Sequence, residues 1–227
     1  MFLKVIKKKI RENNFLRKKF LSFSIFLHNY SYSLIKKFLV RPGELHPKHR
    51  IMGYHNFFVK NVNESDKVLD IGCGNGALAH DVAEKAKKVA GIDINKTNIK
   101  IANEKYKREN LEFIYGDATS YDFSKLGIKK FDKIILSNIL EHIENRIDFL
   151  NNLHKLSDII LLRVPMLNRD WLTVYKKENE YKYILDPGHF IEYTLESLKE
   201  ELETSGWEIA NYSVQFGETW GIIINKS

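Results

Sequence analysis

The segment from Val68 to Ala77 (VLDIGCGNGA) constrains the fold of this chain more than any other. An apolar run containing one acid, Asp70, leads into glycines at positions 72, 74 and 76. Because glycine has no Cβ and tolerates positive φ, a ligand can lie directly against such a turn. A helical pattern follows, and the positive end of the helix dipole would point at the same place. The segment predicts a strand, a turn and a helix with a nucleotide-like ligand at the tip of the strand.

The glycine spacing alone leaves the ligand open. Gly72-x-Gly74-x-x-Ala77 also fits the dinucleotide fingerprint, and Asp93 lies at a suitable distance downstream to hold a ribose. A nicotinamide-dependent oxidoreductase would also need a catalytic Tyr-x-x-x-Lys or a similar site. Tyr121 and Lys125 have that spacing, but they fall in a predicted loop. This oxidoreductase and an ordinary structural turn both remain alternatives.

Length and cysteine content limit the class of protein. A chain of 227 residues with 44% hydrophobic content suffices for one domain with a substantial core and an extension. Its one cysteine, Cys73, excludes a disulfide framework and a multi-cysteine zinc site, and we interpret it as a small filler within the turn. Without a disulfide or a cleavable signal pattern, we expect the protein in the cytoplasm.

The positive charge is concentrated in the first fifty residues, which hold 13 lysines and arginines and two acids. The rest of the chain is mildly acidic. A nucleic-acid enzyme more often carries its positive face around the active site, so this distribution argues against a nucleic-acid partner.

Residues 1–43 are predicted to form a basic amphipathic helical extension, followed by a domain over residues 44–227, with the segment Arg41 to Glu44 as the joint. No window reaches the roughly 18 apolar residues that a spanning helix needs. Residues 1–40 could lie on the anionic inner face of a membrane, or pack on their own domain or on a second subunit. Apolar residues three or four apart form the predicted stripe: Leu16, Phe20, Phe23, Leu27, Tyr30, Leu34 and Phe38.

Strand and helix patterns alternate along the remainder of the chain. A short helix is predicted from Pro47 to Val59, and an irregular segment from Met166 to His189. The alternation predicts an α/β fold, namely a Rossmann-like, doubly wound, mostly parallel seven-stranded sheet that ends in an antiparallel β-hairpin. Predicted strands are 67–71, 88–93, 111–115, 131–136, 158–164, 207–216 and 219–225, and predicted helices are 76–87, 96–109, 140–155 and 195–205.

Four segments in this order and spacing resemble the class I S-adenosylmethionine-dependent methyltransferases, over roughly residues 50–226. The resemblance implies a methyltransferase whose cofactor is S-adenosylmethionine. The closing strand pair is also what this family adds to a Rossmann-like sheet. The segments are Asp70-Ile-Gly-Cys-Gly-Asn-Gly76, Gly91-Ile-Asp93, Tyr115-Gly-Asp117-Ala118 and the stretch from Phe131 to His142.

The resemblance assigns roles around the cofactor. The three glycines would admit its methionine part, and Asp93 would accept the ribose hydroxyls. Asp117 would accept the adenine amine, with Ala118 leaving room beside it. Asp70 would orient the glycine loop or the ammonium group. For Asp93 and Asp117, the alternative is an acid at a strand end that caps the next helix. The predicted cofactor set is Asp70, Gly72, Cys73, Gly74, Gly76, Asp93, Ile94, Asp117, Ala118 and Ser137.

Methyl transfer to oxygen or nitrogen requires an aligned acceptor and a base with a pKa near neutrality. The candidates are Glu141 with His142, which follow the fourth strand, and His189 before the last helix. The alternatives are a structural role at the helix start for the first pair and an ordinary loop histidine for His189. Candidate substrate contacts are Arg163, Arg169, Trp171, Tyr175 and Glu192, of which Arg169 would suit an anionic acceptor.

Missing motifs narrow the acceptor. Ser137 to Leu140 lacks the Asn/Asp-Pro-Pro-aromatic motif of base amino methyltransferases. Asn138 occupies the first ligand position of the Glu-x-x-Glu-His pattern of metal-dependent RNA-end methyltransferases, so we expect no metal. Metal binding through Glu141, His142 and His189 is the alternative. These absences disfavour base methylation. The Glu141-His142 arrangement resembles that of methyltransferases acting on quinone precursors, sugars and polyketide-like acceptors, and with the basic N-terminal segment this resemblance implies O-methylation of a small-molecule, saccharide or lipid-linked acceptor. A non-catalytic cofactor-binding partner subunit is an alternative, and the oligomeric state stays open.

Overall fold

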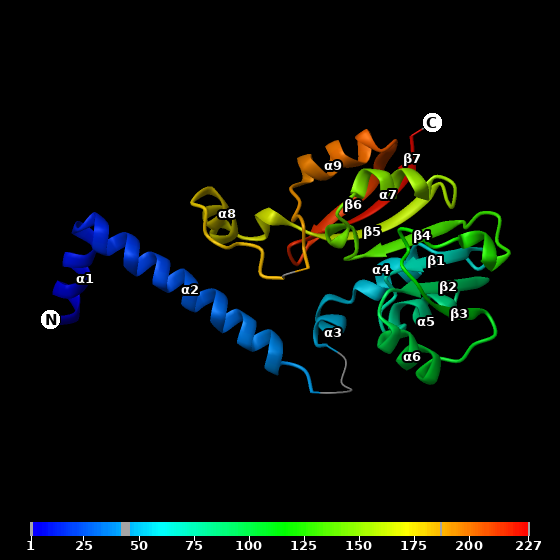
Figure 1. Ribbon diagram of the computed structural model, residues 1–227, viewed down its shortest axis with the longest axis horizontal. Coiled ribbons are helices and arrows are strands. Elements are labelled where there is room, and N and C mark those ends of the chain that lie inside the picture. The colour runs from blue at the N-terminus through cyan, green and yellow to red at the C-terminus, as the bar shows by residue number, and fades with distance from the viewer. Residues whose placement is uncertain (1, 42–45, 187, 227) are drawn as a thin grey trace. The chain divides into compact units, whose positions relative to one another are not determined.

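The computed structural model describes residues 2–41, 46–186 and 188–226 (Figure 1). Its contacts divide the chain into a helical unit, Met1–Ile51 with Leu172–Pro187, and a sheet unit, Met52–Trp171 with Gly188–Ser227. The predicted domain boundary after residue 43 lies outside the described residues. Residues 172–186, which the sequence placed in the second domain, pack within the helical unit.

The sheet unit contains one seven-stranded sheet, counted over the described residues, with strand order β3-β2-β1-β4-β5-β7-β6. The first five strands pair in parallel, and β7 runs antiparallel to both β5 and β6. The predicted Rossmann-like sheet with a closing antiparallel hairpin is confirmed. The strands are β1 (Lys67–Ile71), β2 (Lys88–Asp93), β3 (Leu111–Tyr115), β4 (Lys133–Ser137), β5 (Ile159–Pro165), β6 (Trp207–Gln215) and β7 (Glu218–Asn225).

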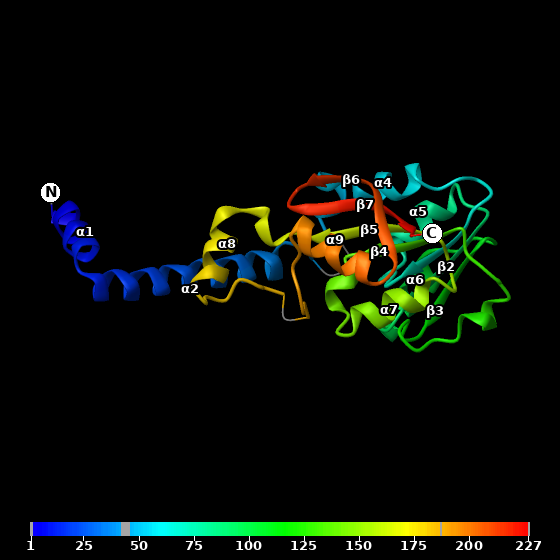
Figure 2. The same cartoon turned by 90° about the horizontal axis from the view of Figure 1, so that it is seen from above.

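Helices cover both faces of this sheet (Figure 2). Successive strand residues point to opposite faces, so Ile134 and Leu136 join one apolar core and Ile135 joins the other. The first core includes α7 and α9, and the second includes α4, α5 and α6. These helices are α4 (Tyr54–Lys60), α5 (Ala77–Ala83), α6 (Lys96–Lys105), α7 (Arg146–Leu153) and α9 (Leu195–Thr204).

The helices depart from the predicted ranges. The helix predicted over residues 140–155 is a 3₁₀ turn, η2 (Leu140–His142), followed by α7, because Ile143 adopts an extended backbone and packs against the core. The helix predicted from Pro47 to Val59 divides at Gly53, which has a φ of +58°. It forms α3 (Lys48–Met52) and α4 instead. The segment predicted to be irregular contains η3 (Leu167–Arg169) and α8 (Trp171–Glu178), and η1 spans Phe123–Leu126.

The helical unit contains α1 (Phe2–Glu12) and α2 (Asn14–Phe38). The Asn13 side chain caps α2 by accepting a hydrogen bond from the Leu16 backbone N–H. Ile25 is the buried apolar residue of α2, whereas all seven residues of the predicted stripe are exposed. Within the described residues, no helix is long and apolar enough to cross a bilayer.

Candidate active site

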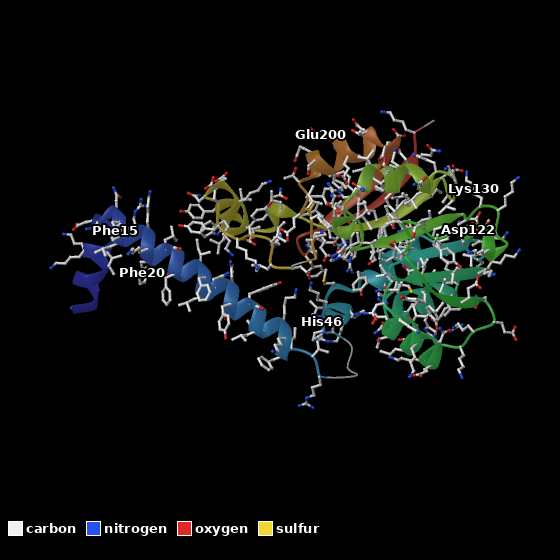
Figure 3. The ribbon with its side chains drawn as sticks, in the orientation of Figure 1. Phe15, Phe20, His46, Asp122, Lys130 and Glu200 are labelled. Carbon is white, nitrogen blue, oxygen red and sulfur yellow. The ribbon has the colours of Figure 1, made fainter. Side chains whose placement is uncertain are left out.

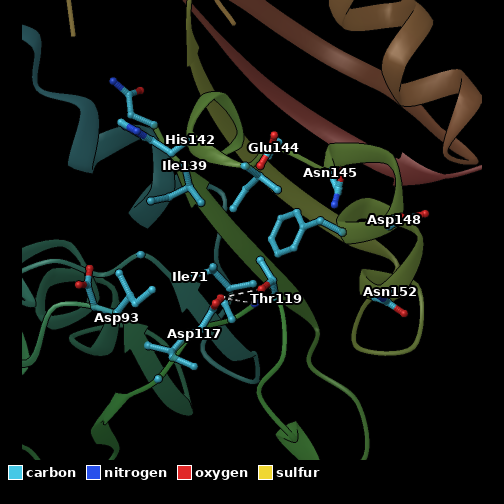
Figure 4. Close-up of a pocket in the computed structure, with 18 residues that line it drawn as sticks. Ile71, Asp93, Asp117, Thr119, Ile139, His142, Glu144, Asn145, Asp148 and Asn152 are labelled. Atoms are coloured by element: carbon cyan, nitrogen blue, oxygen red, sulfur yellow. Dashed lines mark hydrogen bonds between the residues drawn. The ribbon is translucent and has the colours of Figure 1, made fainter. Parts of the chain in front are cut away.

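A cleft of about 720 Å³ lies where parallel strands end at the carboxyl edge of the sheet (Figure 4). Open α/β sheets bind ligands at this edge, where the turns that follow the strands present backbone groups. The cleft is lined by Ile71, Gly72, Ile92, Asp93, Ile94, Gly116, Asp117, Ala118, Thr119, Asn138, Ile139, His142, Ile143, Glu144, Asn145, Asp148, Phe149 and Asn152.

Glycine is required at the three positions after β1 for different structural reasons. Their φ values are +72°, +54° and +82°, a region that side chains with a Cβ rarely adopt. A Cβ at Gly72 would meet Ile139 at 1.9 Å, and one at Gly76 would meet Phe113 at 2.6 Å. A Cβ at Gly74 would meet nothing within 4 Å. Gly72 and Gly76 therefore serve packing, and Gly74 leaves open space against the backbone.

Asp93, at the end of β2, holds the glycine turn in place. Its Oδ2 accepts a hydrogen bond from the Gly74 N–H at 2.8 Å, and its Oδ1 accepts one from the Asn95 N–H at 2.7 Å. The cap of α6 is Asn95, whose side chain accepts from two backbone N–H groups of that helix. The sequence suggested that Asp70 would orient the glycine turn. In the structure Asp93 makes the hydrogen bond to that turn instead.

Asp117 and Ala118 lie across the cleft, in the turn after β3. Asp117 Oδ1 accepts hydrogen bonds from the backbone N–H and the hydroxyl of Thr119, at 2.9 and 2.8 Å (Figure 4). The carboxylate thus stabilises its own turn while lining the cleft. Asp93 and Asp117 therefore line one cleft from neighbouring strand ends.

Asp70 is a buried carboxyl in the middle of the sheet, only 1% exposed. Burial and the negative charge of Asp93 raise the pKa of Asp70 to about 8. Its Oδ2 has no hydrogen-bond partner among the described residues. Because an unpaired buried polar atom is costly, such a carboxyl favours a cationic partner, such as the ammonium group of a cofactor.

The other three residues predicted to contact the cofactor differ in exposure. Cys73 is buried against Gly91, where a Cβ would lie 2.9 Å from its Sγ, and burial raises the pKa of its thiol. It fits the predicted role of a small filler. Ile94 is exposed and lines the cleft. Ser137 is half-buried and ends β4, in register with Arg163, but it is not among the cleft residues.

The structure brings the three catalytic candidates together. Potential ligand atoms of Glu141, His142 and His189 all lie within 4.8 Å of one another. The two imidazole rings meet edge to face, with their centroids 4.6 Å apart. His142 Nδ1 donates to the Gly188 carbonyl at 2.9 Å, and the Phe190 N–H donates to the Glu141 carbonyl at 2.8 Å. These two bonds join η2 to the segment that carries His189.

Glu141 is a fully buried carboxyl group whose pKa is raised towards neutrality. It is 0% exposed, and neither carboxylate oxygen has a hydrogen-bond partner among the described residues. Burial raises the pKa of Glu141 to about 7, against the opposing influence of His189 and Arg163. His142 is the member of this trio that lines the cleft. The same three groups offer one oxygen and two nitrogen ligands for a metal ion, and the expected absence of a metal stays a prediction.

Arg163 belongs to a buried network that sequence reasoning missed. Arg163 is 7% exposed; its Nε donates to Asn138 Oδ1 at 2.9 Å and lies 3.2 Å from a carboxylate oxygen of Glu218. The Trp220 indole N–H donates to Glu218 at 3.3 Å, and the Tyr54 ring lies 3.6 Å from the guanidinium. Arg163 thus supports Asn138, a cleft residue with a φ of +56°. Its direct contact with substrate stays a prediction.

The other candidate substrate residues are divided between the two units. Arg169 ion-pairs with Glu192, whose other oxygen lies 3.8 Å from His189 Nδ1. Arg169 and Glu192 are therefore connected to the catalytic candidates. Trp171 is exposed on the sheet unit, whereas Tyr175 belongs to the helical unit.

Comparison with known proteins agrees with this geometry. Residues 62–205 match the family described as "Methyltransferase domain". The ubiquinone biosynthesis O-methyltransferase of Bartonella tribocorum is 36% identical over 106 residues, covering 46% of this chain and 42% of that protein. The enzyme of the same name from Rhizobium johnstonii is 30% identical over 155 residues, covering 65% and 62%. The chain thus spans less than two thirds of the length of these relatives.

Solved structures share the fold. The magnesium protoporphyrin IX methyltransferase of Synechocystis, with bound SAH, has a TM-score of 0.62 and 20% identity, covering 88% of this chain and 96% of that one. The mitomycin 7-O-methyltransferase MmcR has a TM-score of 0.60 and 13% identity, covering 77% and 53%. At these identities the likeness concerns the fold alone.

Proposed function

The chain belongs to the class I S-adenosylmethionine-dependent methyltransferases, and we propose that it methylates an oxygen atom of a small-molecule, saccharide or lipid-linked acceptor. The family match covers the glycine turn and the strands after it, so the oxidoreductase alternative is not retained. The cofactor, when bound, supplies an electrophilic methyl group. The observation that carries the proposal is Glu141, a buried carboxyl with a pKa of about 7 and no hydrogen-bond partner among the described residues.

The residues around the cleft fit the cofactor. Gly74 leaves room for its methionine part, and Asp70 offers an unpaired oxygen to its ammonium group. Each oxygen of Asp93 accepts one backbone N–H and retains a lone pair for a ribose hydroxyl. Asp117 and Ala118 take the adenine. Gly74, Asp70 and the two acids that line the cleft thus each contact a different part of the cofactor.

The trio of Glu141, His142 and His189 removes the proton of the acceptor hydroxyl. His142, the member of the trio that lines the cleft, accepts the proton of the acceptor hydroxyl and passes a proton on to the neighbouring Glu141. As the acceptor oxygen bonds to the methyl carbon, the bond between that carbon and the donor sulfur breaks, and the sulfur keeps the electron pair. A pKa of about 7 lets Glu141 hold or release a proton at neutral pH, which suits a general base. The names of the two ubiquinone biosynthesis relatives support oxygen as the methylated atom.

The test measures transfer of labelled methyl from S-adenosylmethionine to a panel of phenols, catechols and sugars. With an accepted substrate, Glu141→Gln should lower kcat by about 10²- to 10⁴-fold, because it removes the base without changing the shape of the side chain. Binding of S-adenosylhomocysteine should be unchanged. Glu200→Gln, the same substitution at an exposed position on α9, should leave kcat at the wild-type value. Turnover by Glu141→Gln at the wild-type rate would remove Glu141 from the mechanism.

A further inference from the structure

Helix α2 carries a broad apolar face that no described residue of the helical unit covers. Six aromatic side chains of this face are each at least 55% exposed: Phe15, Phe20, Phe23, Phe26, Tyr30 and Phe38. Phe15 and Phe20 are labelled on the helix in Figure 3. At 100° per residue they span about 140° of the helix circumference, and leucines 16, 27 and 34 lie among them. We call this surface the aromatic face. An exposed apolar patch of this kind marks an interaction site.

The helical unit packs through the opposite side of α2. Ile25, the buried residue of α2, lies there, and so does Asn29. Asn29 Oδ1 accepts from Lys176 Nζ at 2.7 Å, and Asn29 Nδ2 donates to the Lys182 carbonyl at 2.9 Å. Lys36, on the same side, ion-pairs with Asp186 at 3.4 Å. Packing within the unit therefore leaves the aromatic face bare, the reverse of an ordinary amphipathic surface helix.

The charge of this region indicates the partner. From Phe2 to Phe38 the chain holds ten lysines and arginines and one acid, Glu12. Lys19 Nζ lies 4.5 Å from the centre of the Phe15 ring, and Lys37 Nζ lies 5.8 Å from that of Phe38. On the same scale both lysines project within the aromatic face, where their long side chains can carry the ammonium groups past the rings to lipid headgroups. A second copy would bring like positive charges together, whereas an anionic lipid surface offers negative headgroups beside an apolar interior.

We propose that the aromatic face of α2 binds the surface of an anionic lipid bilayer. The helix lies in the plane of the interface, with its rings at the boundary between headgroups and acyl chains and its lysines reaching the phosphates. No helix of the described residues can span the bilayer, so the contact is peripheral. This inference concerns α2 alone and does not depend on the acceptor or on the catalytic trio.

The test is flotation of the full chain with vesicles of phosphatidylglycerol and phosphatidylcholine, and with vesicles of phosphatidylcholine alone. The wild-type protein should float with the mixed vesicles at low salt. The double variant Phe23→Gln and Leu27→Gln should partition about tenfold less, because two apolar side chains are lost and glutamine preserves the helix. The matched control, Ile101→Gln with Val214→Gln, replaces two exposed apolar residues of the sheet unit and should float like the wild type.

Lys19 and Lys37 allow a second, independent test of the electrostatic contribution to vesicle binding. Lys19→Gln with Lys37→Gln should weaken binding to mixed vesicles by about fivefold per charge, and should leave binding to neutral vesicles unchanged. Circular dichroism verifies that each variant keeps its helix content. Equal flotation of the wild type and the Phe23/Leu27 variant overturns the proposal, as does failure of the wild type to float. If the wild type forms a dimer and does not bind vesicles, and if the Phe23/Leu27 variant is monomeric, the aromatic face binds a second copy of the chain instead.

Discussion

Replacing Glu141 with glutamine should make the sheet unit more stable at alkaline pH while it removes the proposed base. The usual pKa of this carboxyl is 4.5, and burial raises it to about 7. Between these values the folded state keeps a proton that the unfolded state has released. The free energy of unfolding of the wild type therefore falls as pH rises from about 4.5 to about 7, and this contribution is constant above that window. Glutamine is neutral throughout and has no such loss.

The difference between the two pKa values corresponds to about 3 kcal/mol of unfolding free energy. Solvent screening does not reduce this value, because Glu141 is 0% exposed. Glu141→Gln should thus match the wild type near pH 4 and exceed it by about 3 kcal/mol at pH 8. Asp70 has the same direction of pH dependence, but its contribution is common to both proteins and cancels.

Urea unfolding followed by tryptophan fluorescence measures this difference. All three tryptophans, Trp171, Trp207 and Trp220, belong to the sheet unit, so their signal follows the unit that contains Glu141. Glu200→Gln serves as the control and should keep the wild-type pH dependence. If Glu141→Gln and the wild type lose stability in parallel between pH 5 and pH 8, Glu141 is not a buried, uncompensated carboxyl and the argument for its basicity fails.

Three further results are expected. Asp93→Ala should weaken binding of S-adenosylhomocysteine by about 1 to 3 kcal/mol in calorimetry, because charge-assisted bonds are lost; unchanged affinity would contradict the ribose role. Gly74→Ala should reduce cofactor affinity with only a modest loss of melting temperature, whereas Gly76→Ala should lower the melting temperature more, because its Cβ meets Phe113 at 2.6 Å. Dialysis against a chelator should leave methyl transfer unchanged; loss of activity that a divalent cation restores would make the trio around Glu141 a metal site.

The sequence predicted strands well where apolar runs are short and sharply bounded. The ranges 67–71, 88–93 and 111–115 match β1, β2 and β3 residue for residue. Helix ends were predicted too late, because helical periodicity continues past the last hydrogen-bonded turn. The helix predicted over residues 96–109, for example, ends at Lys105, where Tyr106 turns to an extended backbone.

Local motifs in the sequence predict the residues around the cofactor, but they do not predict the buried network around Arg163. Asp93 and Asp117 directly follow or end predicted strands, so their convergence on one cleft could be foreseen. Glu218 reaches Arg163 only because β7 inserts between β5 and β6, a pairing that no local pattern encodes. Tyr54 lies upstream of the glycine turn, and no signal in its own segment indicated a site.

The apolar periodicity of the N-terminal segment also predicted only part of what the structure shows. Periodicity located a continuous apolar stripe on α2, but it could not tell which side of the helix packs. Ile25, outside that stripe, is the residue that becomes buried. Residues 172–186 gave no sequence signal that they would pack in the helical unit.

Calorimetric titration of S-adenosylhomocysteine and of NAD into the full chain tests most directly whether the glycine turn and its acids bind the methyl donor. We predict one-to-one binding of S-adenosylhomocysteine in the micromolar range and no heat from NAD. An absence of heat from S-adenosylhomocysteine, together with tight binding of NAD, would contradict the account.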